Sequence, residues 1–336
     1  MALIADLHLH SRYSRATSPR MELKSLAQTA AKKGIDIVGS GDFTHPEWFS
    51  YLKENLVPAE PGLFKLKDGK DNKVRFILSC EVSCIYSKGG RVRKVHHIIL
   101  APSLESAEKI NKKLALYGNL AADGRPIFGA DSLAILKIVL HADPSCLFIP
   151  AHAWTPWFAI FGSKSGFNSI QECFGDYSTY IYAVETGLSS DPAMNWRLSA
   201  LDKITLVSFS DAHSPEKLGR EATVFNTAPD FYEIVKAIKT KDPEKILYTI
   251  EFFPQEGKYH YDGHRLCGLS FSPSESKENN NLCPRCGRVL TIGVLSRVEE
   301  LADRPEGVKP QNAIPYKSIV PLQEIIAEVL KQGVGS

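Results

Sequence analysis

The sequence predicts an α/β fold: a barrel of alternating strands and helices, followed by a smaller region that carries a cysteine cluster. Short apolar runs alternate with amphipathic helical patterns up to about residue 250. About seven strands separated by helices favour a parallel sheet that closes, or nearly closes, into a barrel. From Phe252 onward the alternation stops, and a polar loop and three cysteines take its place. We therefore expect two units, residues 1–250 and residues 251–336.

The predicted elements follow one another in a regular order. Ala2–His10 is the first strand, and the amphipathic run Met21–Lys33 after it predicts a helix. The later strands are expected at Ile35–Gly41, Val74–Cys80, Val95–Ala101, Cys146–Ala151, Tyr180–Glu185 and Ile204–Ser210. The later helices are expected at Leu104–Tyr117, Asp131–His141, Pro192–Leu201, Phe231–Lys239 and Leu322–Leu330.

The composition excludes several classes of protein. Of 336 residues, 43% are hydrophobic and 23% are charged, which excludes generic disorder. A net charge of +2 excludes a polybasic nucleic-acid binder but allows one basic groove. The most apolar stretch, Cys146–Gly162, is interrupted by prolines and a histidine, so no membrane span is expected. Asp6, His8 and His10 fall where a signal peptide needs an apolar run, so we expect a cytoplasmic protein.

Histidines and carboxylates cluster at the predicted strand ends. Side chains alternate along a strand, so in Asp6-Leu7-His8-Leu9-His10 the two histidines share one face and can bind one metal. Residues of the same kind lie in or after the later strands, namely Asp42, Glu81, His96, His97, His152, Glu185, Asp211 and His213. Because the C-terminal ends of parallel strands gather at one rim, these side chains are expected to meet there.

A rim of this kind predicts a multinuclear metal centre for phosphoester hydrolysis. Imidazole and carboxylate ligands without thiolates suit zinc, manganese or iron. Such metals lower the pKa of bound water towards about 7 and stabilise the attacking and leaving oxygens of the ester. A single histidine at a strand end is more often a core residue, but one polar residue at each of several strand ends favours a site. Asp211, His213 and Glu81 are the candidate catalytic residues, with Asp211 as ligand and proton acceptor.

Six segments around these residues carry a family resemblance. They are D-L-H-L-H at 6–10, G-S-G-D at 39–42, Glu81, V-H-H-I-I-L at 95–100, A-H at 151–152 and S-D-A-H at 210–213. In them the chain resembles the PHP (polymerase and histidinol phosphatase) domain, which implies a distorted TIM-like (βα)7 barrel with a trinuclear rim centre. The ligands implied are His8, His10, Glu81 and Asp211 for one metal, Glu81, His152 and either His96 or His97 for a second, and Asp42 and His213 for a third.

Two departures from the PHP pattern concern the third metal. Ala16 stands where many members of the family have a histidine, and Asp42 is followed by Phe43-Thr44-His45 where many read D-H. The third metal is therefore the least supported of the three, and His45 is an alternative ligand for it. Between His96 and His97 we favour His97 as the ligand.

Longer segments narrow the resemblance to the endonuclease Q family. They are P-A-H-A-W-T-P-W-F at 150–158, F-G-S-K-S-G-F at 161–167, M-N-W-R-L-S-A-L-D at 194–202, S-D-A-H-S-P-E-K-L-G-R-E-A at 210–222, K-Y-H-Y-D-G-H-R-L-C at 258–267 and C-P-R-C at 283–286. That family nicks DNA on the 5′ side of deaminated bases (hypoxanthine, xanthine, uracil) and at abasic sites. The resemblance implies a nucleoid-associated repair endonuclease with a multinuclear metal-hydroxide mechanism. Its members often extend further, so we expect a missing C-terminal segment, for which a sliding clamp is a candidate partner.

Cys267, Cys283 and Cys286 predict a structural zinc site in a small second domain. A C-x-x-C pair at 283–286 is half of a common zinc signature, but Ser270 stands where the first pair would have its second cysteine. The fourth ligand is His264, His260 or a water. The expected cofactors are thus two or three Zn²⁺ ions at the rim and one in the cysteine cluster, with Mg²⁺ or Mn²⁺ as alternatives for activity.

Recognition of a damaged base requires that it leave the helical stack, so base flipping is expected. Aromatic residues can then stack on the base, and basic residues can bind the phosphates. The candidate DNA-binding residues are Trp154, Trp157, Lys164, Phe167, Asn195, Arg197, Lys217 and Arg220, with Tyr259 and Tyr261 facing them. The alternatives are a small-molecule phosphatase such as histidinol phosphatase, which has no need of the cysteine module, and a DNA-binding scaffold that has lost catalysis.

Overall fold

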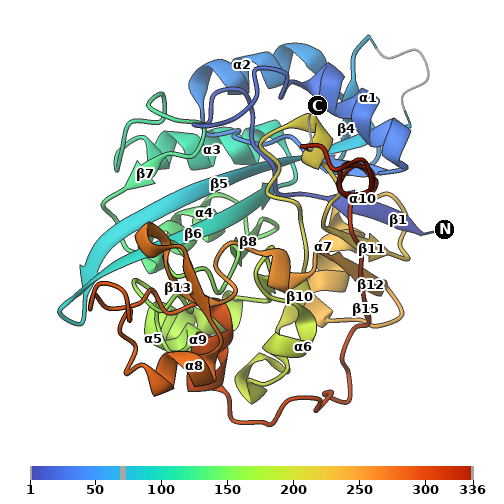
Figure 1. Cartoon of the computed structure of the whole chain (residues 1–336). Helices are drawn as coiled ribbons and strands as arrows, with labels where there is room; N and C mark the ends of the chain where they lie inside the picture. Colours follow the sequence, from blue (N-terminus) through green and yellow to red (C-terminus); the bar gives the residue numbers. More distant parts are fainter. Residues whose placement is uncertain (1, 69–72, 334–336) are drawn as a thin grey trace.

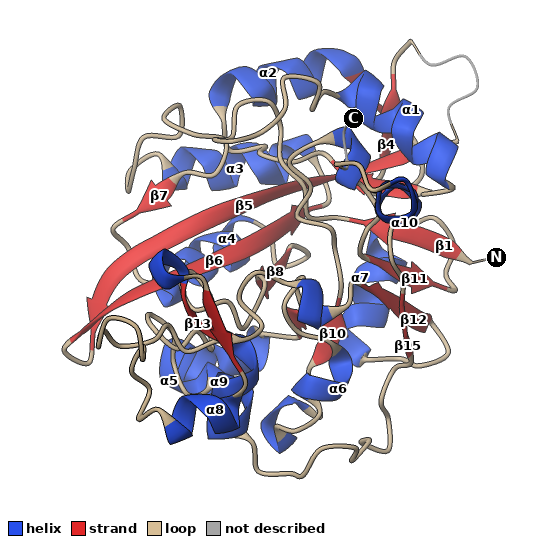
Figure 2. Cartoon of the chain, in the orientation of Figure 1, coloured by secondary structure: helices blue, strands red, loops and turns tan. Residues whose placement is uncertain are grey.

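The computed structural model describes residues 2–68 and 73–333, and its main feature in these ranges is a sheet of eleven strands (Figures 1 and 2). Three parallel strands lie together in it: β1 (Leu3–Asp6), β2 (Ile37–Gly39) and β5 (Arg75–Lys88). They are connected by α1 (Leu23–Lys33), α2 (Pro46–Asn55) and the short strands β3 (Leu56–Pro58) and β4 (Phe64–Leu66). The predicted α/β class is confirmed.

One connection differs from the predicted strand–helix alternation. β5 continues through Glu81 to Lys88 and turns back directly as β6 (Arg91–Ala101), so the two strands form a long antiparallel hairpin. The turn is Gly89-Gly90, and both residues have positive φ angles (61° and 70°), which glycine adopts without steric cost. The hairpin pairs on its far side with β8 (Leu147–Pro150), also antiparallel, and β7 (Ile127–Phe128) adds to β5.

The remaining strands of the barrel lie beyond β8 or on the side of β1 that faces away from β2. β9 (Ala183–Glu185) and β10 (Thr205–Val207) pair in parallel, and a parallel bridge between Leu9 and Ala212 joins the extensions of β1 and β10. β11 (Ala222–Phe225) pairs antiparallel with β1, and β12 (Ile246–Glu251) pairs antiparallel with β11. The helices between these strands are α3 (Leu104–Leu114), α4 (Ser132–Ala142), α5 (Ile170–Phe174), α6 (Pro192–Asn195) and α7 (Phe231–Thr240).

Two apolar layers hold the barrel together. The inner cluster contains residues that alternate along the strands, such as Ala5 and Leu7, with Ile77, Ile149 and Val207. The outer cluster packs the opposite faces of the strands against the helices and includes Val38, Phe76 and Leu26. Because both faces of the strands are covered, the polar residues at the strand ends are left to gather at the rim.

The chain beyond residue 250 contacts the barrel through several of its segments. Its hairpin of β13 (Asp262–His264) and β14 (Leu269–Phe271) lies with α8 (Pro273–Glu278) and α9 (Val294–Leu301) beside the loop around residue 161 (Figure 1). β15 (Tyr316–Ser318) returns to the main sheet and pairs in parallel with β12, and α10 (Leu322–Leu330) follows it. Among the residues described, none of the helices has the length and apolar character needed to cross a lipid bilayer.

Candidate metal centre

Six of the predicted ligands lie together at the rim of the barrel. They form two groups that share Glu81, and within each group one ligand atom per residue lies within 4.8 Å of the others. The first group is His8, His10, Glu81 and Asp211, and the second is Glu81, His96 and His152. The side chains are almost completely buried except for Asp211 (28% exposed) and His152 (12% exposed), which face the solvent side of the site.

The first group is arranged around the imidazoles that follow β1. Nε2 of His10 lies 3.1 Å from Asp211 Oδ1 and 3.4 Å from Glu81 Oε2. Nε2 of His8 lies 3.7 Å from a carboxylate oxygen of each of these acids. This His8 nitrogen is buried and has no hydrogen-bond partner among the described residues. A buried nitrogen without a partner, aimed between two carboxylates, fits a bound cation.

The second group is arranged around one oxygen of Glu81, Oε1. Oε1 lies 2.9 Å from Nδ1 of His96 and 3.1 Å from Nε2 of His152. Oε2, in contrast, faces His10. Oε1 also lies 3.7 Å from Nε2 of His8, so Glu81 contacts both groups, as a carboxylate that bridged two metal ions would.

The preference for His97 over His96 as a ligand is wrong. His96 and His97 are neighbours in β6, so their side chains lie on opposite faces of the hairpin. His97 faces away from Glu81: its Nε2 lies 2.8 Å from Ser132 Oγ, and its ring packs against Phe148. His97 is therefore a core residue, and His96 supplies the imidazole at the rim.

Two further carboxylates orient the histidines of the first group. Glu185 lies 2.9 Å from Nδ1 of His8, and Asp42 lies 3.2 Å from Nδ1 of His10. With Nδ1 held in this way, Nε2 of each ring is directed into the site, and such outer carboxylates also strengthen a histidine as a metal ligand. Asp42 is itself fixed by the backbone N–H of Ser11 (2.6 Å) and by the Ser11 and Ser14 hydroxyls.

The described residues do not bring a third group of ligands together at the rim. Both oxygens of Asp42 are occupied by the contacts just described, and Asp42 is completely buried. His213 lies beside His10, with ring centroids 4.4 Å apart, and its Nδ1 lies 2.9 Å from the backbone oxygen of Asp211. His45 caps α2 by accepting from the Trp48 N–H and stacks on Tyr13. Asp42 therefore positions His10, and His45 has a structural role.

Backbone strain is concentrated at this rim. Asp42, His152 and Asp211 have φ angles of 43°, 30° and 47°, in a region that non-glycine residues seldom adopt. Each residue follows a strand at the point where its side chain must turn into the site. Strained backbone at three predicted site residues is typical of a functional centre, where the surrounding structure stabilises a costly geometry.

The charges of the site favour a cation. Burial alone would lower the pKa values of His8 and His10, but Glu185 and Asp42 beside them outweigh it and raise both well above the ordinary histidine value. Burial would raise the pKa of Glu81, yet His96, Arg125 and His8 hold it well below the ordinary value. The carboxylates thus stabilise positive charge on the imidazoles, and the same negative potential would stabilise a bound metal ion.

Arg125 belongs to the site, although the sequence analysis did not identify it. Its Nη1 donates to Glu81 Oε2 at 2.9 Å, and 27% of its side chain is exposed. It lines a cleft of about 560 Å³ in front of the two ligand groups, together with His96, His152, Asp211, Lys217 and Arg220. No motif marks Arg125 in the sequence, because the loop that carries it reaches the rim only through the pairing of β7 with β5.

The predicted DNA-binding residues divide into three sets. Trp157, Lys217 and Arg220 line the cleft, as do Tyr259 and Lys258 from the region after residue 250. Trp154, Phe167 and Asn195 are buried and line neither this cleft nor the one next to it; Trp154 donates its indole N–H to Asn195, and Phe167 packs under Arg93. Lys164 and Arg197 lie outside the residues that line this cleft.

A second cleft, of about 520 Å³, continues from the first towards the cysteine region. The two clefts share Trp157, Gly257, Lys258 and Tyr259. Tyr261 and Arg265 line the second cleft further on, and Tyr261 is 39% exposed. The rings of Trp157 and Tyr259 lie edge to face, 6.1 Å apart, where the clefts meet. Aromatic surface therefore adjoins the metal centre.

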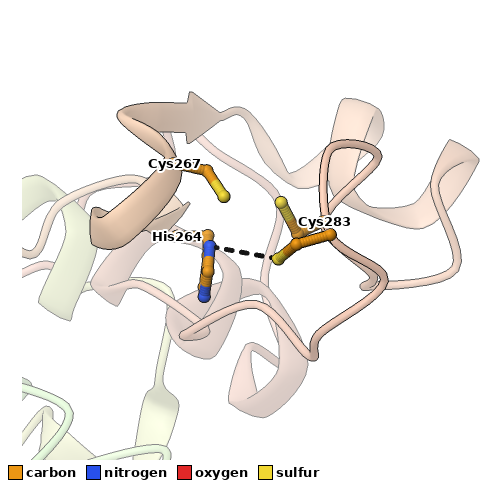
Figure 3. A group of neighbouring side chains, drawn as sticks. His264, Cys267 and Cys283 are labelled. Atoms are coloured by element: carbon orange, nitrogen blue, oxygen red, sulfur yellow. Dashed lines mark hydrogen bonds between the residues drawn. The ribbon is translucent and has the colours of Figure 1, made fainter.

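The cysteine cluster forms a third group of ligands, away from the rim. His264, Cys267, Cys283 and Cys286 have ligand atoms within 4.8 Å of one another (Figure 3). Nδ1 of His264 lies 3.6 Å from Cys286 Sγ, while His260 is buried with its Nδ1 3.2 Å from the backbone oxygen of Ser189. Of the alternatives for the fourth ligand, the structure places His264 in the cluster. Three thiolates and one imidazole fit a tetrahedral structural zinc site.

Comparisons with known proteins extend over the whole chain. No family model matches it. The uncharacterized protein YqxK of Bacillus subtilis is 30% identical over 335 residues, which cover 96% of this chain and 82% of that protein. The lesion-specific endonuclease PfuEndoQ from Pyrococcus furiosus has a similar structure, with a TM-score of 0.86 at 35% identity, over 100% of this chain and 80% of that chain. Endonuclease Q in complex with a 27-mer duplex substrate, with an abasic lesion at the active site, gives a TM-score of 0.87 at 34% identity over 100% and 81%.

Proposed function

The chain belongs to the endonuclease Q family, and on this basis we propose that it is a DNA repair endonuclease that cuts on the 5′ side of hypoxanthine, xanthine, uracil and abasic sites. It is a metal-dependent DNA-cleaving hydrolase. In the proposed reaction water adds to phosphorus and the bond from phosphorus to the 3′-oxygen breaks. The 3′-oxygen takes up a proton, so the products carry a 3′-hydroxyl and a 5′-phosphate.

One observation carries this proposal: two ligand groups that share Glu81 open into a cleft lined by basic and aromatic side chains. The ligand groups fit a pair of metal ions, and the cleft is long enough to receive more than a single phosphate group because it continues into the second cleft. A phosphatase for a small metabolite has no use for this second cleft. A strand of DNA, in contrast, needs both a cutting site and a place for the damaged nucleotide.

The residues that would hold the metals are those of the two groups. We assign His8, His10, Glu81 and Asp211 to one ion and Glu81, His96 and His152 to the other. Zn²⁺ fits these ligands, and Mg²⁺ or Mn²⁺ are alternatives for activity. When bound, such ions lower the pKa of coordinated water and offset the negative charge of the phosphate.

Other side chains would move protons and bind the substrate. Nδ1 of His213 is held by the Asp211 backbone oxygen, which leaves Nε2 free to exchange a proton with the reacting oxygens. Lys217 lines the cleft, where it pairs with Glu324, and would exchange this partner for phosphate oxygens when DNA binds. Trp157 and Tyr259, where the clefts meet, are placed to stack on a flipped base or to fill the gap at an abasic site.

The region from residue 251 to residue 336, whose last three residues lie outside the described part, would form a zinc-binding unit. In this proposal His264, Cys267, Cys283 and Cys286 bind one structural Zn²⁺. The hairpin that carries His264 also carries Arg265 and Ser270, which line the second cleft. A metal here would therefore fix the wall of the cleft that faces the damaged base.

A nicking assay tests the function. End-labelled duplexes carry one hypoxanthine, uracil or abasic site, and undamaged DNA, a chelator and the variant Asp211→Asn serve as controls. We expect a metal-dependent nick immediately 5′ of the lesion that is absent with the variant and with undamaged DNA. If no lesion is nicked while a phosphate monoester such as histidinol phosphate is hydrolysed, the chain is a phosphatase and the proposal is wrong.

A further inference from the structure

Arg125 is held against the metal centre from two sides. Its neighbour Pro126 accepts a hydrogen bond from the backbone N–H of Ser83 at 3.0 Å, and β7 then pairs with β5 two residues beyond Glu81. On the other side, the backbone N–H of Gly124 donates to the Tyr13 oxygen at 3.0 Å. The loop is therefore fixed both to the strand that carries Glu81 and to the segment that follows His10.

Glycine at position 124 allows this loop to approach the site closely. A Cβ atom at this position would lie 2.3 Å from Asp42 Oδ2 and 2.3 Å from Ser14 Oγ, which no side chain could tolerate. The backbone thus packs directly against the carboxylate that orients His10. Arg125, the next residue, extends from this contact point to Glu81.

The guanidinium group has donors left over. An arginine has five N–H donors in a planar fork, and the structure uses one of them, Nη1, for Glu81 Oε2. The rest of the group has no hydrogen-bond partner among the described residues. The side chain is 27% exposed and lines the cleft beside His96, His152 and Asp211. Its free donors therefore lie at the cleft surface where a substrate phosphate must enter to reach the metals.

Two other cations of the cleft, Arg220 and Lys217, are engaged elsewhere, whereas Lys258 is exposed and lies over the Tyr259 ring. Arg220 uses Nε to hold the backbone oxygen of Ser210 at 2.8 Å and so braces the strand end that carries Asp211. Lys217 is paired with Glu324 of α10 at 2.9 Å. Among the described residues, Arg125 is the one arginine whose guanidinium pairs with the side chain of a candidate metal ligand; Arg220 and Arg285 reach only backbone oxygens of such residues.

We propose that Arg125 is a catalytic residue that binds a nonbridging oxygen of the scissile phosphate while Glu81 holds its guanidinium in place. This inference rests on the proposed function and adds a group that neither the sequence motifs nor the ligand set includes. The planar fork suits two phosphate oxygens, and charge that develops on them during hydrolysis would be met by a fixed cation as well as by the metals. A structural ion pair that only neutralises Glu81 is the competing explanation.

A substrate that lacks the negative charge of the scissile phosphate distinguishes phosphate binding by Arg125 from a purely structural ion pair with Glu81. The probe is an abasic duplex in which the scissile phosphate is replaced by a methylphosphonate, and its affinity is measured by fluorescence anisotropy in the presence of a chelator. We expect wild-type protein to bind the phosphate duplex roughly 10-fold more tightly than the methylphosphonate duplex. Arg125→Gln should bind both equally, and Arg125→Lys should keep part of the preference. Arg91→Gln, at the exposed start of β6, is the matched control and should behave as wild type.

Two further measurements complete the test. With metal present, Arg125→Gln should slow single-turnover nicking of the unmodified duplex about 100-fold while the rim metal content per chain stays at the wild-type level. If Arg125→Gln retains the wild-type preference for phosphate, or loses rim metal, Arg125 acts only on Glu81 and the inference is wrong. Failure of the wild-type protein to nick the unmodified abasic duplex would instead overturn the proposed function.

Discussion

The two candidate metal regions of this chain are built in opposite ways. The ligands at the rim are contributed by residues 8 to 211, from five separate strand ends or strands, and most of them are completely buried. The ligands of the cysteine cluster lie between residues 264 and 286, on one hairpin and one turn. Of these, Cys283 is buried and Cys286 is exposed.

Because of this difference, the two sites should acquire their geometry in different ways. The rim is held by the barrel strands and by oriented partners such as Glu185 and Asp42, so we expect its geometry to exist before any metal binds. The cysteine cluster has few such partners, and short segments of this kind gain much of their order from the metal itself. Loss of the rim metals should therefore abolish activity but leave the barrel folded. Loss of the metal in the cysteine cluster should instead disorder that region but leave the rim metals in place.

The largest effect is expected from Glu81→Gln. Glutamine keeps the shape of the side chain but cannot bridge two ions, so both rim metals should be lost while the fold remains. Nicking should fall at least about 10³-fold, and the metal content should fall to about one equivalent per chain, the zinc of the cysteine cluster. Elemental analysis with single-turnover assays measures both. A variant that keeps its full metal content would show that Glu81 does not bridge.

Cys286→Ser should have the complementary effect. The variant should lose about one metal equivalent per chain and keep the rim metals, because the two regions share no ligand. Lesion binding should weaken about 10-fold, since Arg265 and Ser270 of the second cleft lie on the hairpin beside the cluster. Limited proteolysis should cut first between residues 265 and 290.

The two sites also differ in how they can be identified from sequence. The spacing of Cys283 and Cys286 marks the cluster directly, and His264 needed only the β13–β14 hairpin to be distinguished from His260. The rim was predicted from strand ends, which identified Asp42, Glu81, His152 and Asp211, because alternation and parallel topology place such residues together.

Properties that depend on three-dimensional packing were not accessible. The choice between His96 and His97 depends on which face of β6 meets Glu81, and the Gly89-Gly90 turn fixes this by making a hairpin. Trp154 and Phe167 looked like base-stacking residues because aromatic residues serve both cores and ligand sites. Arg125 was missed because a long connection brings it to the rim.

A smaller effect is expected from Asp42→Asn, which tests whether the rim is organised before metal binds. The asparagine side chain cannot accept all of the hydrogen bonds that Ser11, Ser14 and His10 direct at the carboxylate, so His10 should lose its fixed orientation. Rim metal affinity, measured by competition with a chelator, should fall about 10-fold to 100-fold. Asp176→Asn, at an exposed position, is the control. Unchanged affinity would mean that the metal, rather than Asp42, orders His10.

The smallest effect concerns a buried acid pair below the rim. Glu251 is completely buried, and burial raises its pKa to about 8. Its neighbour Glu221 is also completely buried, with its pKa raised well above the ordinary value by burial and by Glu251. Glu251 therefore keeps its proton in the folded state up to about pH 8 but loses it near pH 4.5 when the chain unfolds. Unfolding then releases a proton between these values, so this group makes the fold less stable as the pH rises through that window.

Glu251→Gln should remove this dependence from the barrel without touching either metal region. One proton changes the free energy of unfolding by at most about 1.4 kcal/mol per pH unit. The stability of the variant relative to wild type should therefore increase steadily between pH 5 and pH 8 and stay constant above pH 8. Glutamine can still accept from the Thr186 or Ser208 hydroxyl, which limits any loss of packing. Chemical denaturation at several pH values measures the difference, with Glu278→Gln at an exposed position of α8 as control. A constant difference between variant and wild type across this range would mean that Glu251 is ionised in the folded protein, and that the floor of the rim, unlike its ligands, bears an unpaired charge.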